Sequence, residues 1–88
     1  MKIEKSEKKN KKYKVKHNGK YVHFGDSRYQ QFKDTTGLGL YSKLDHNDKT
    51  RQKNFCKRSG GIKDKNGKLT KNDKFSSNAL SRRFLWSC

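Results

Sequence analysis

Proline is absent from this chain of 88 residues, and hydrophobic side chains make up only 27% of it. No apolar run is long enough to cross a bilayer, and the first twelve residues, MKIEKSEKKNKK, lack the apolar stretch of a signal peptide. We therefore expect a protein that is made in the cytoplasm and has no membrane span. A chain this short and polar buries only a thin core, so we expect one small domain that its partners help to order.

Acidic residues are scarce: 8 Asp and Glu stand against 24 Lys and Arg, which gives a net charge of +16. The basic residues occur along the whole chain, which favours a domain lying against an acidic partner over a neutral domain with one basic arm. Nineteen of them are lysine, which contacts phosphate as a point charge, whereas arginine supplies the fork that reads guanine. We therefore expect no sequence-specific readout of bases.

Signatures of catalysis and metal binding are also missing. The sequence contains no P-loop and no dinucleotide fingerprint, and no nucleophile can be paired with an adjacent base, so we expect no enzyme and no cofactor. Structural zinc sites combine closely spaced Cys and His residues, and no such spacing occurs here, so we expect no metal. The residues concerned are His17, His23, His46, Cys56 and Cys88.

The two cysteines leave two alternatives open. Two free thiols are the favoured interpretation in a reducing compartment, because two cysteines are too few for a disulfide scaffold. The other alternative is a bridge between Cys56 and Cys88, which would join the main predicted helix to the C-terminus.

A β-hairpin is the strongest local prediction. Asn18-Gly19 accepts the positive φ that both central positions of a type I′ turn require. Pairing across this turn gives the hairpin one apolar face and one face of basic residues and rings. The predicted pairs are Tyr13 with Phe24 and Val15 with Val22 on the apolar face, and Lys14 with His23 and Lys16 with Tyr21 on the other.

The main helix is predicted from about His46 to Arg58, with Asp45 as its N-cap and Gly60-Gly61 as its stop signal. Three lysines recur at helical spacing and form a cationic stripe, and three other residues share a narrow inner face. Like charges at this spacing destabilise an isolated helix, so an anionic partner would relieve the stripe, although a merely solvated face is the alternative. The stripe consists of Lys49, Lys53 and Lys57, and the inner face of Gln52, Phe55 and Ser59.

The remaining segments are predicted to be loops and one short helix. Residues 27–44 show no sustained period, which indicates an ordered loop with one short helical turn. Asn66-Gly67 marks a lysine-rich loop or a short edge hairpin. Near the C-terminus, Ser76 or Ser77 can cap a short helix whose apolar side chains would complete the core, with anchoring of the tryptophan in a neighbouring protein as the alternative. These side chains are Leu80, Phe84, Leu85 and Trp86.

The fold class that follows is a small α+β fold. We expect an N-terminal β-hairpin packed on one main helix and a short C-terminal helix, together forming a single basic domain over residues 13–88. Residues 1–12 have almost no apolar side chain to pack and are expected to form a flexible basic leader.

Candidate contacts for nucleic acid or another polyanion lie on the outer face of the hairpin, on the main helix and near the C-terminus. Lysines would neutralise phosphates, with an affinity that falls as salt rises, and rings would stack on unpaired bases. An acidic protein surface would satisfy the same charges without any bases. The candidates are Lys12, Lys14, Lys16, Tyr21, His23, Lys49, Arg51, Lys53, Lys57, Arg58, Arg82 and Arg83.

The segments KKYKVKHNGKYVHFGDSRYQQFKD and LYSKLDHNDKTRQKNFCKRSG and the terminal FLW resemble a family of small basic proteins encoded by giant and other large nucleocytoplasmic DNA viruses. The resemblance covers about Lys11 to Trp86 and rests on the His-Phe-Gly end of the hairpin, the Leu-Asp-His-x-Asp cap and the final Leu-Trp. Ser59 stands where relatives usually carry a histidine. The family supplies no catalytic residue, but it implies a viral context and favours oxidation of Cys56 or Cys88.

The leading functional expectation is therefore a non-enzymatic virion protein of a large DNA virus, made in the host cytoplasm. Such a minor capsid or core component would bind acidic capsid or core proteins, or the genome, through its lysine-rich faces. The alternative is a DNA-binding or RNA-binding protein of low sequence specificity that condenses or coats viral DNA. A host-directed binding factor that stays outside the particle is a third class.

Overall fold

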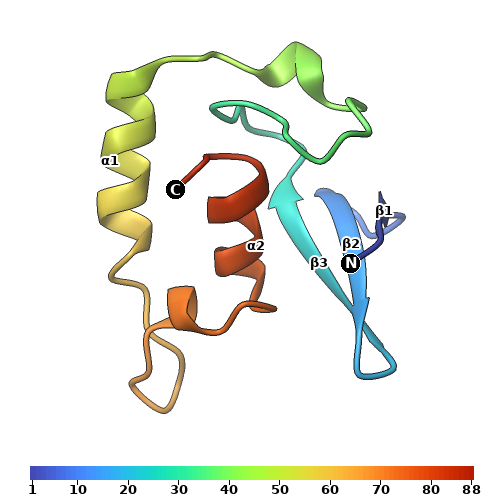
Figure 1. Ribbon diagram of the computed structural model, residues 1–88, viewed down its shortest axis with the longest axis vertical. Coiled ribbons are helices and arrows are strands. Elements are labelled where there is room, and N and C mark those ends of the chain that lie inside the picture. The colour runs from blue at the N-terminus through green and yellow to red at the C-terminus, as the bar shows by residue number, and fades with distance from the viewer.

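The computed structural model describes residues 1–88, and it confirms a small α+β fold with a three-stranded antiparallel sheet and two helices (Figure 1). The strands lie side by side in the order β1, β2, β3. The elements are β1 (Ile3–Lys5), β2 (Lys11–His17), β3 (Lys20–Asp26), the short 3-10 helix η1 (Ser42–Leu44), α1 (Lys49–Ser59), the short 3-10 helix η2 (Thr70–Asn72) and α2 (Ser77–Phe84).

The hairpin of β2 and β3 has the predicted register. Tyr13 lies opposite Phe24 and Val15 opposite Val22, and the two pairs predicted for the other face also form. Asn18 adopts a φ of 52° and the following glycine a φ of 78°, as the type I′ turn requires. A tight local turn thus fixes the pairing of the whole hairpin.

The expectation of a flexible leader over residues 1–12 is wrong for residues 3–5, which form β1, and for Lys11 and Lys12, which belong to β2. Ile3 lies opposite Val15 and Lys5 opposite Tyr13, and the Ile3 side chain packs against the core. The chain reverses between β1 and β2 through Asn10, which has a φ of 64°. This pairing partly buries Ile3, the one apolar residue of the strand, which offsets part of the entropy of ordering it.

Helix α1 begins three residues later than predicted, because Asp48 and not Asp45 is its N-cap. The Asp48 carboxylate accepts hydrogen bonds from two backbone N–H groups of the first turn, at 2.9 and 3.2 Å. Asn47 has a φ of 53°, which cannot continue a right-handed helix. The stop at Gly60, by contrast, is confirmed, since this residue is the C-cap.

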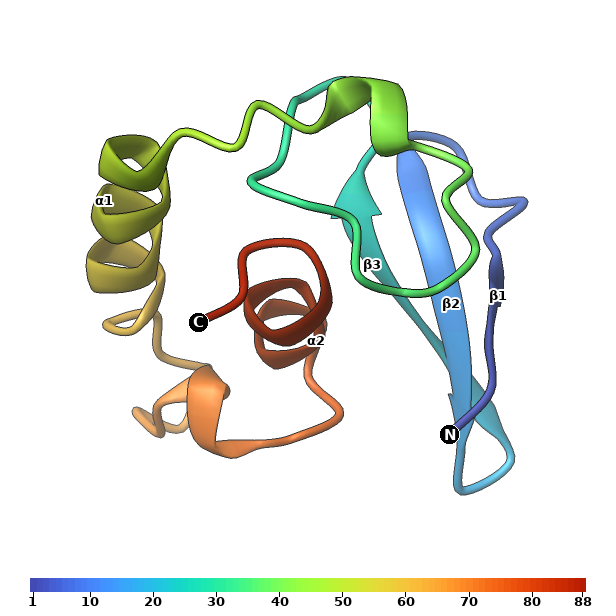
Figure 2. The ribbon, with the colours of Figure 1, turned by 45° about the horizontal axis from the view of Figure 1, so that its top comes forward.

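Helix α2 lies between α1 and the sheet (Figures 1 and 2). Its predicted cap is confirmed, because the Ser76 hydroxyl accepts a hydrogen bond from the backbone N–H of Ala79 at 3.0 Å. The hairpin packs on α2, as predicted, but α1 packs on α2 and not on the hairpin, which corrects that part of the predicted packing. Neither helix has the length and apolar composition that crossing a membrane requires.

The core is as thin as the composition predicts. Five hydrophobic residues are buried, and they come from the apolar face of the hairpin and from α2 and its end. They are Tyr13, Val15, Phe24, Leu80 and Leu85. Trp86 packs against this cluster and stacks on Phe55 of α1, with ring centroids 4.1 Å apart and an angle of 11° between the planes.

The two cysteines form a disulfide between Cys56 in α1 and Cys88, with the Cα atoms 5.8 Å apart. The favoured interpretation of two free thiols is therefore wrong for this structure, which contains the alternative, the bridge.

Two loop predictions are confirmed. The segment after the hairpin contains the single short turn η1, and Gly67 has a φ of 79° at the tip of a loop closed by one bridge between Lys63 and Leu69.

Candidate nucleic-acid interface

Helix α1 carries five basic residues and no acidic one, and all five side chains are exposed. The structure contains two salt bridges, Lys14 with Glu7 and Arg28 with Asp26, so none of the five is neutralised by an ion pair. The predicted stripe and inner face are both confirmed, since the stripe is exposed and the inner face is partly or fully buried. The five residues, which we call the α1 basic face, are Lys49, Arg51, Lys53, Lys57 and Arg58.

The outer face of the hairpin is less positive than predicted. Lys14 Nζ lies 2.7 Å from a carboxylate oxygen of Glu7, in the turn that leads from β1 into β2. This contact raises the pKa of Lys14 and lowers that of Glu7. Lys14 also lies over the Tyr21 ring, 4.3 Å from its centroid, and Tyr21 is 45% exposed. The face keeps an accessible ring, but part of its charge is compensated.

Two other predicted members of this face differ in their exposure. His23 is half-buried, and its Nδ1 lies 2.7 Å from the hydroxyl oxygen of Ser6 in the N-terminal segment. Lys16 is exposed next to Tyr21, with its Nζ 5.8 Å from the ring centroid. The hairpin therefore offers Lys16 and Tyr21 to a partner, whereas His23 is engaged within the chain.

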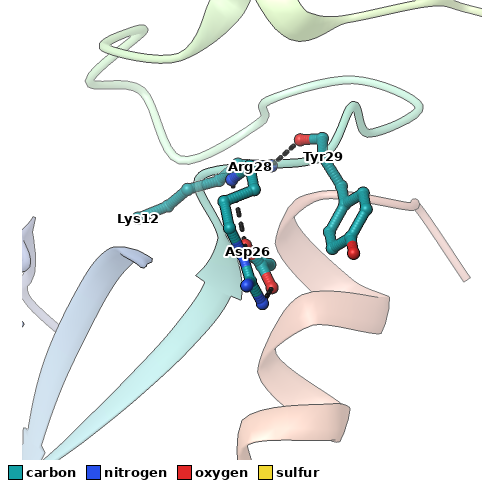
Figure 3. Close-up of polar contacts among 4 residues, drawn as sticks. All are labelled: Lys12, Asp26, Arg28 and Tyr29. Carbon is teal, nitrogen blue, oxygen red and sulfur yellow. Dashed lines mark hydrogen bonds and ion pairs between the residues drawn. The ribbon is translucent and has the colours of Figure 1, made fainter. Parts of the chain in front are cut away.

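Lys12 was predicted on the exposed face, but it is only 2% exposed. Its ammonium group donates to the backbone carbonyl of Tyr29 at 3.0 Å (Figure 3) and to the side-chain oxygen of Gln31. Burial lowers the pKa of Lys12 to about 8, although nearby carboxylates, Asp26 first among them, act in the opposite direction. Lys12 thus holds the loop that follows β3 against the sheet, and its position corrects the prediction of an exposed contact.

Arg28 and Asp26 form a bidentate pair at the end of β3 (Figure 3). The guanidinium Nε and Nη2 donate to the two carboxylate oxygens at 3.0 and 2.8 Å. Hydrogen bonds from the Arg28 side chain and backbone lower the pKa of Asp26 to about 2. The carboxylate therefore stays ionised and keeps Arg28 beside the Tyr29 ring, where the guanidinium carbon lies 5.5 Å from the ring centroid.

A cleft of about 710 Å³ lies between the end of the sheet and α1. One wall comes from the start of β2, the end of β3 and the loop after it, including Lys11, Arg28 and Tyr29. The facing wall comes from α1 and includes Arg51 and Arg58, while α2 and the residues just after it line the remainder. A hydrogen bond of 2.9 Å from Arg51 to the side-chain oxygen of Gln30 joins the two walls.

The two arginines predicted near the C-terminus have different places. Arg82 is half-buried and donates to the backbone carbonyl of Cys56 at 2.6 Å and to the hydroxyl of Ser59 at 2.7 Å. It therefore ties α2 to the last turn of α1. Arg83 is exposed and lies over the Phe84 ring, 4.8 Å from its centroid, so it remains available at the surface.

The structure brings only part of the predicted set together. Arg51, Arg58 and the buried Lys12 line the cleft, whereas the accessible hairpin residues lie on the sheet, which α2 separates from α1 (Figure 2). Lys11, Arg28 and Tyr29 also line the cleft, and they are not among the residues predicted from the sequence. The signal for them in the sequence is the adjacent basic and aromatic pair Arg28-Tyr29, which lies in the segment predicted to be an ordered loop. Tyr29 is 64% exposed.

No group of three or more His, Cys, Asp or Glu side chains lies close enough together to hold a metal ion.

Residues 1–36 match the sequence profile of a family of unknown function, DUF5754. Among curated proteins and solved structures there is no match. The similarity to a family of unknown function thus agrees with the sequence analysis, whereas the viral context stays a prediction, because the matching family carries no information on source or activity.

Proposed function

We propose that the protein is a non-enzymatic, low-specificity nucleic-acid-binding protein, and that the α1 basic face is its main contact. The observation that supports this proposal is the presence of five exposed basic side chains on one helix of eleven residues that has no acidic residue and makes no salt bridge. Lysines of this kind release counterions when they meet phosphates, and the affinity then falls steeply with salt. The accessible ring of Tyr21 on the hairpin adds a second contact, suited to unpaired bases.

The test is a titration of the purified protein against labelled single-stranded and double-stranded DNA at several salt concentrations, with an acidic polymer as competitor. Replacing Lys49, Lys53 and Lys57 with Gln should make the slope of log K against log salt shallower by roughly two to three for duplex DNA. The matched control replaces the exposed Lys63, Lys65 and Lys68, which lie in the loop after α1 and outside the α1 basic face. Equal effects of both triple variants, or full competition by the acidic polymer, would contradict a nucleic-acid interface on α1.

A minor capsid or core protein of a large DNA virus is the second candidate. The dominance of lysine favours it, because lysines adhere to acidic protein surfaces as readily as to phosphates. This proposal includes the virion as the final location and acidic capsid or core proteins as partners. It predicts that the same α1 triple variant is incorporated poorly into particles even when its DNA binding is unchanged, and finding the protein in infected cytoplasm but not in particles would contradict it.

A further inference from the structure

The cleft between the sheet and α1 has the size of a small-molecule site. Its volume of about 710 Å³ lies within the range of roughly 300–1000 Å³ that ligand pockets occupy. It is lined by three separate parts of the chain, the sheet end, α1 and α2. The disulfide and the Arg82 hydrogen bonds hold α1 to α2 and the chain end, and hydrogen bonds from Arg51 to Gln30 and from Ser77 to the backbone carbonyl of His23 tie both helices to the sheet side. The two walls are therefore fixed in place before any ligand arrives, which favours binding.

The charges in the cleft are strongly unbalanced. Its lining contains five basic residues and a single acidic one, Asp26. That carboxylate is already held by Arg28 through two hydrogen bonds. Neither Lys11 nor Arg58 takes part in a salt bridge, so both cations are available to an anionic ligand. The hollow shape concentrates their field, because charges in a cleft are less screened than charges on a convex surface.

The cleft also presents an exposed aromatic ring. Tyr29 is 64% exposed, and the neighbouring Arg28 lies beside its ring. Figure 3 shows the Tyr29 side chain extending from the loop toward α2, while Arg28 points to Asp26. A ring that is flanked by a guanidinium and left open to solvent is a platform on which a planar base can stack.

We propose that this cleft binds one unpaired nucleotide, with its phosphate held by Lys11 and Arg58 and its base stacked on Tyr29. The nucleotide can be free or part of a single strand. Binding of a nucleotide within a single strand rests on the proposed nucleic-acid-binding function, whereas binding of a free nucleotide does not. In a duplex, stacking on the neighbouring base pairs covers both faces of a base, so duplex DNA reaches only the outer cations. An acidic peptide would satisfy the cations but would leave the Tyr29 ring unused.

Two substitutions test the two halves of the site. Tyr29→Ala removes the platform, and Arg58→Gln removes a phosphate contact. Their controls lie outside the cleft. Lys65→Gln changes a lysine in an exposed loop, and Tyr21→Ala removes a ring from the hairpin; Tyr21→Ala is compared only for adenosine monophosphate, because Tyr21 is itself a proposed contact for strands. All four side chains are exposed, and thermal unfolding followed by circular dichroism checks that each variant folds. Binding of labelled oligo(dT), of a duplex of equal length and of adenosine monophosphate is then measured.

The proposal predicts that Tyr29→Ala weakens binding of oligo(dT) by roughly five- to 150-fold and leaves duplex binding unchanged. Arg58→Gln should weaken oligo(dT) and adenosine monophosphate more than Lys65→Gln does. Shifts of the amide signals of Gly25 and Ser81 on adding adenosine monophosphate would support the cleft even if no strand binds, in which case only the nucleic-acid-binding function fails.

Three results would overturn the proposal. The first is an equal loss of single-strand and duplex binding in Tyr29→Ala. The second is an effect of Tyr29→Ala on the binding of adenosine monophosphate that is no larger than that of Tyr21→Ala. The third is displacement of adenosine monophosphate by polyglutamate at matched charge, which would assign the cleft to an acidic peptide.

Discussion

Gly25 at the end of β3 lies directly against Leu85, so that a Cβ atom at Gly25 would stand 2.7 Å from the Leu85 Cδ1 atom. The same position lies 3.1 Å from the aliphatic stem of the buried Lys12, and the residue has a φ of +78°. Glycine is therefore required here for two separate reasons, its positive φ and the close approach of the chain end to the sheet. This contact places the C-terminal segment at the base of the cleft.

Gly25→Ala should lower the free energy of unfolding by about 2–4 kcal/mol, because it adds an overpacked methyl group to the strain of a positive φ. Gly19→Ala is the matched control, since Gly19 has the same φ of +78° and nothing within 4 Å of the new atom. The free energy of unfolding of that variant should fall by about 1–2 kcal/mol. Urea unfolding followed by the fluorescence of Trp86, the single tryptophan, measures both, and equal losses would contradict the packing argument.

Tyr13→Phe should destabilise the protein by about 1.5–3 kcal/mol, because the buried hydroxyl donates to the Asp34 carboxylate and accepts from the backbone N–H of Leu40 at 3.2 Å. Burial and the hydrogen bond to Asp34 raise the pKa of Tyr13 to about 12. The same unfolding experiment applies. Tyr21→Phe removes a surface hydroxyl and should change stability by less than about 0.5 kcal/mol, so similar losses in both variants would count against this contact.

The buried Lys12 should make the protein more stable as the pH rises from 8 to 10. Its pKa is about 8 in the folded chain and about 10.4 when the chain is unfolded. Between these values the unfolded chain binds the proton and the folded chain does not, so raising the pH favours folding, by about 2–3 kcal/mol up to pH 10. Above pH 10 the raised pKa of Tyr13 acts in the opposite direction.

The variant Lys12→Met isolates this effect. Urea unfolding at several pH values gives the free energy of unfolding as a function of pH. Between pH 8 and 10 the slope of this curve should be smaller in the variant than in the natural chain, by the equivalent of about one proton. The variant will be less stable at every pH, because two hydrogen bonds are lost, and the difference in slope is therefore the informative quantity. Parallel curves for the two proteins would show that Lys12 does not titrate in this range.

Loss of the disulfide should lower the free energy of unfolding by about 3–4 kcal/mol, since Cys56 and Cys88 are 32 residues apart and the closed loop restricts the unfolded chain. The total free energy of unfolding of a chain of this length is only about 4–13 kcal/mol, so the reduced form should be only marginally stable. The measurement compares the oxidised protein with the Cys56→Ser, Cys88→Ser double variant. A reductant should destabilise only the former, and a difference below about 1 kcal/mol would contradict the expectation.

The local elements could be predicted from the sequence because short-range chemistry determines them. The turn at Asn18-Gly19 sets the hairpin register, Gly60 ends α1, and Ser76 caps α2. The start of α1 was missed because Asp45 and Asp48 are equally good capping residues. Only the left-handed conformation of Asn47, and the use of Asp45 as an acceptor for the side chain of the buried Gln31 at 2.6 Å, decide between them.

The missed features all depend on contacts between distant parts of the chain. The pairing of β1 and the burial of Lys12 against Gln31 leave no periodic signal, because both segments are polar. The disulfide requires the end of the chain to fold back on α1, a distance that no spacing in the sequence provides. Arg51 and Arg58 could be identified as candidates from the sequence. The cleft that they share with Tyr29 could not, because it also depends on contacts between distant parts of the chain.

Strand β1 has a further consequence for a protein whose proposed role is to crowd along a polyanion. It lies at one edge of the sheet, where an unpaired row of backbone groups invites another copy of the chain to add a strand. This edge is only three residues long and carries Glu4 and Lys5. A short, charged edge is a poor template for strand addition. At this edge, copies that are brought close together on a polyanion therefore have little basis for joining their sheets.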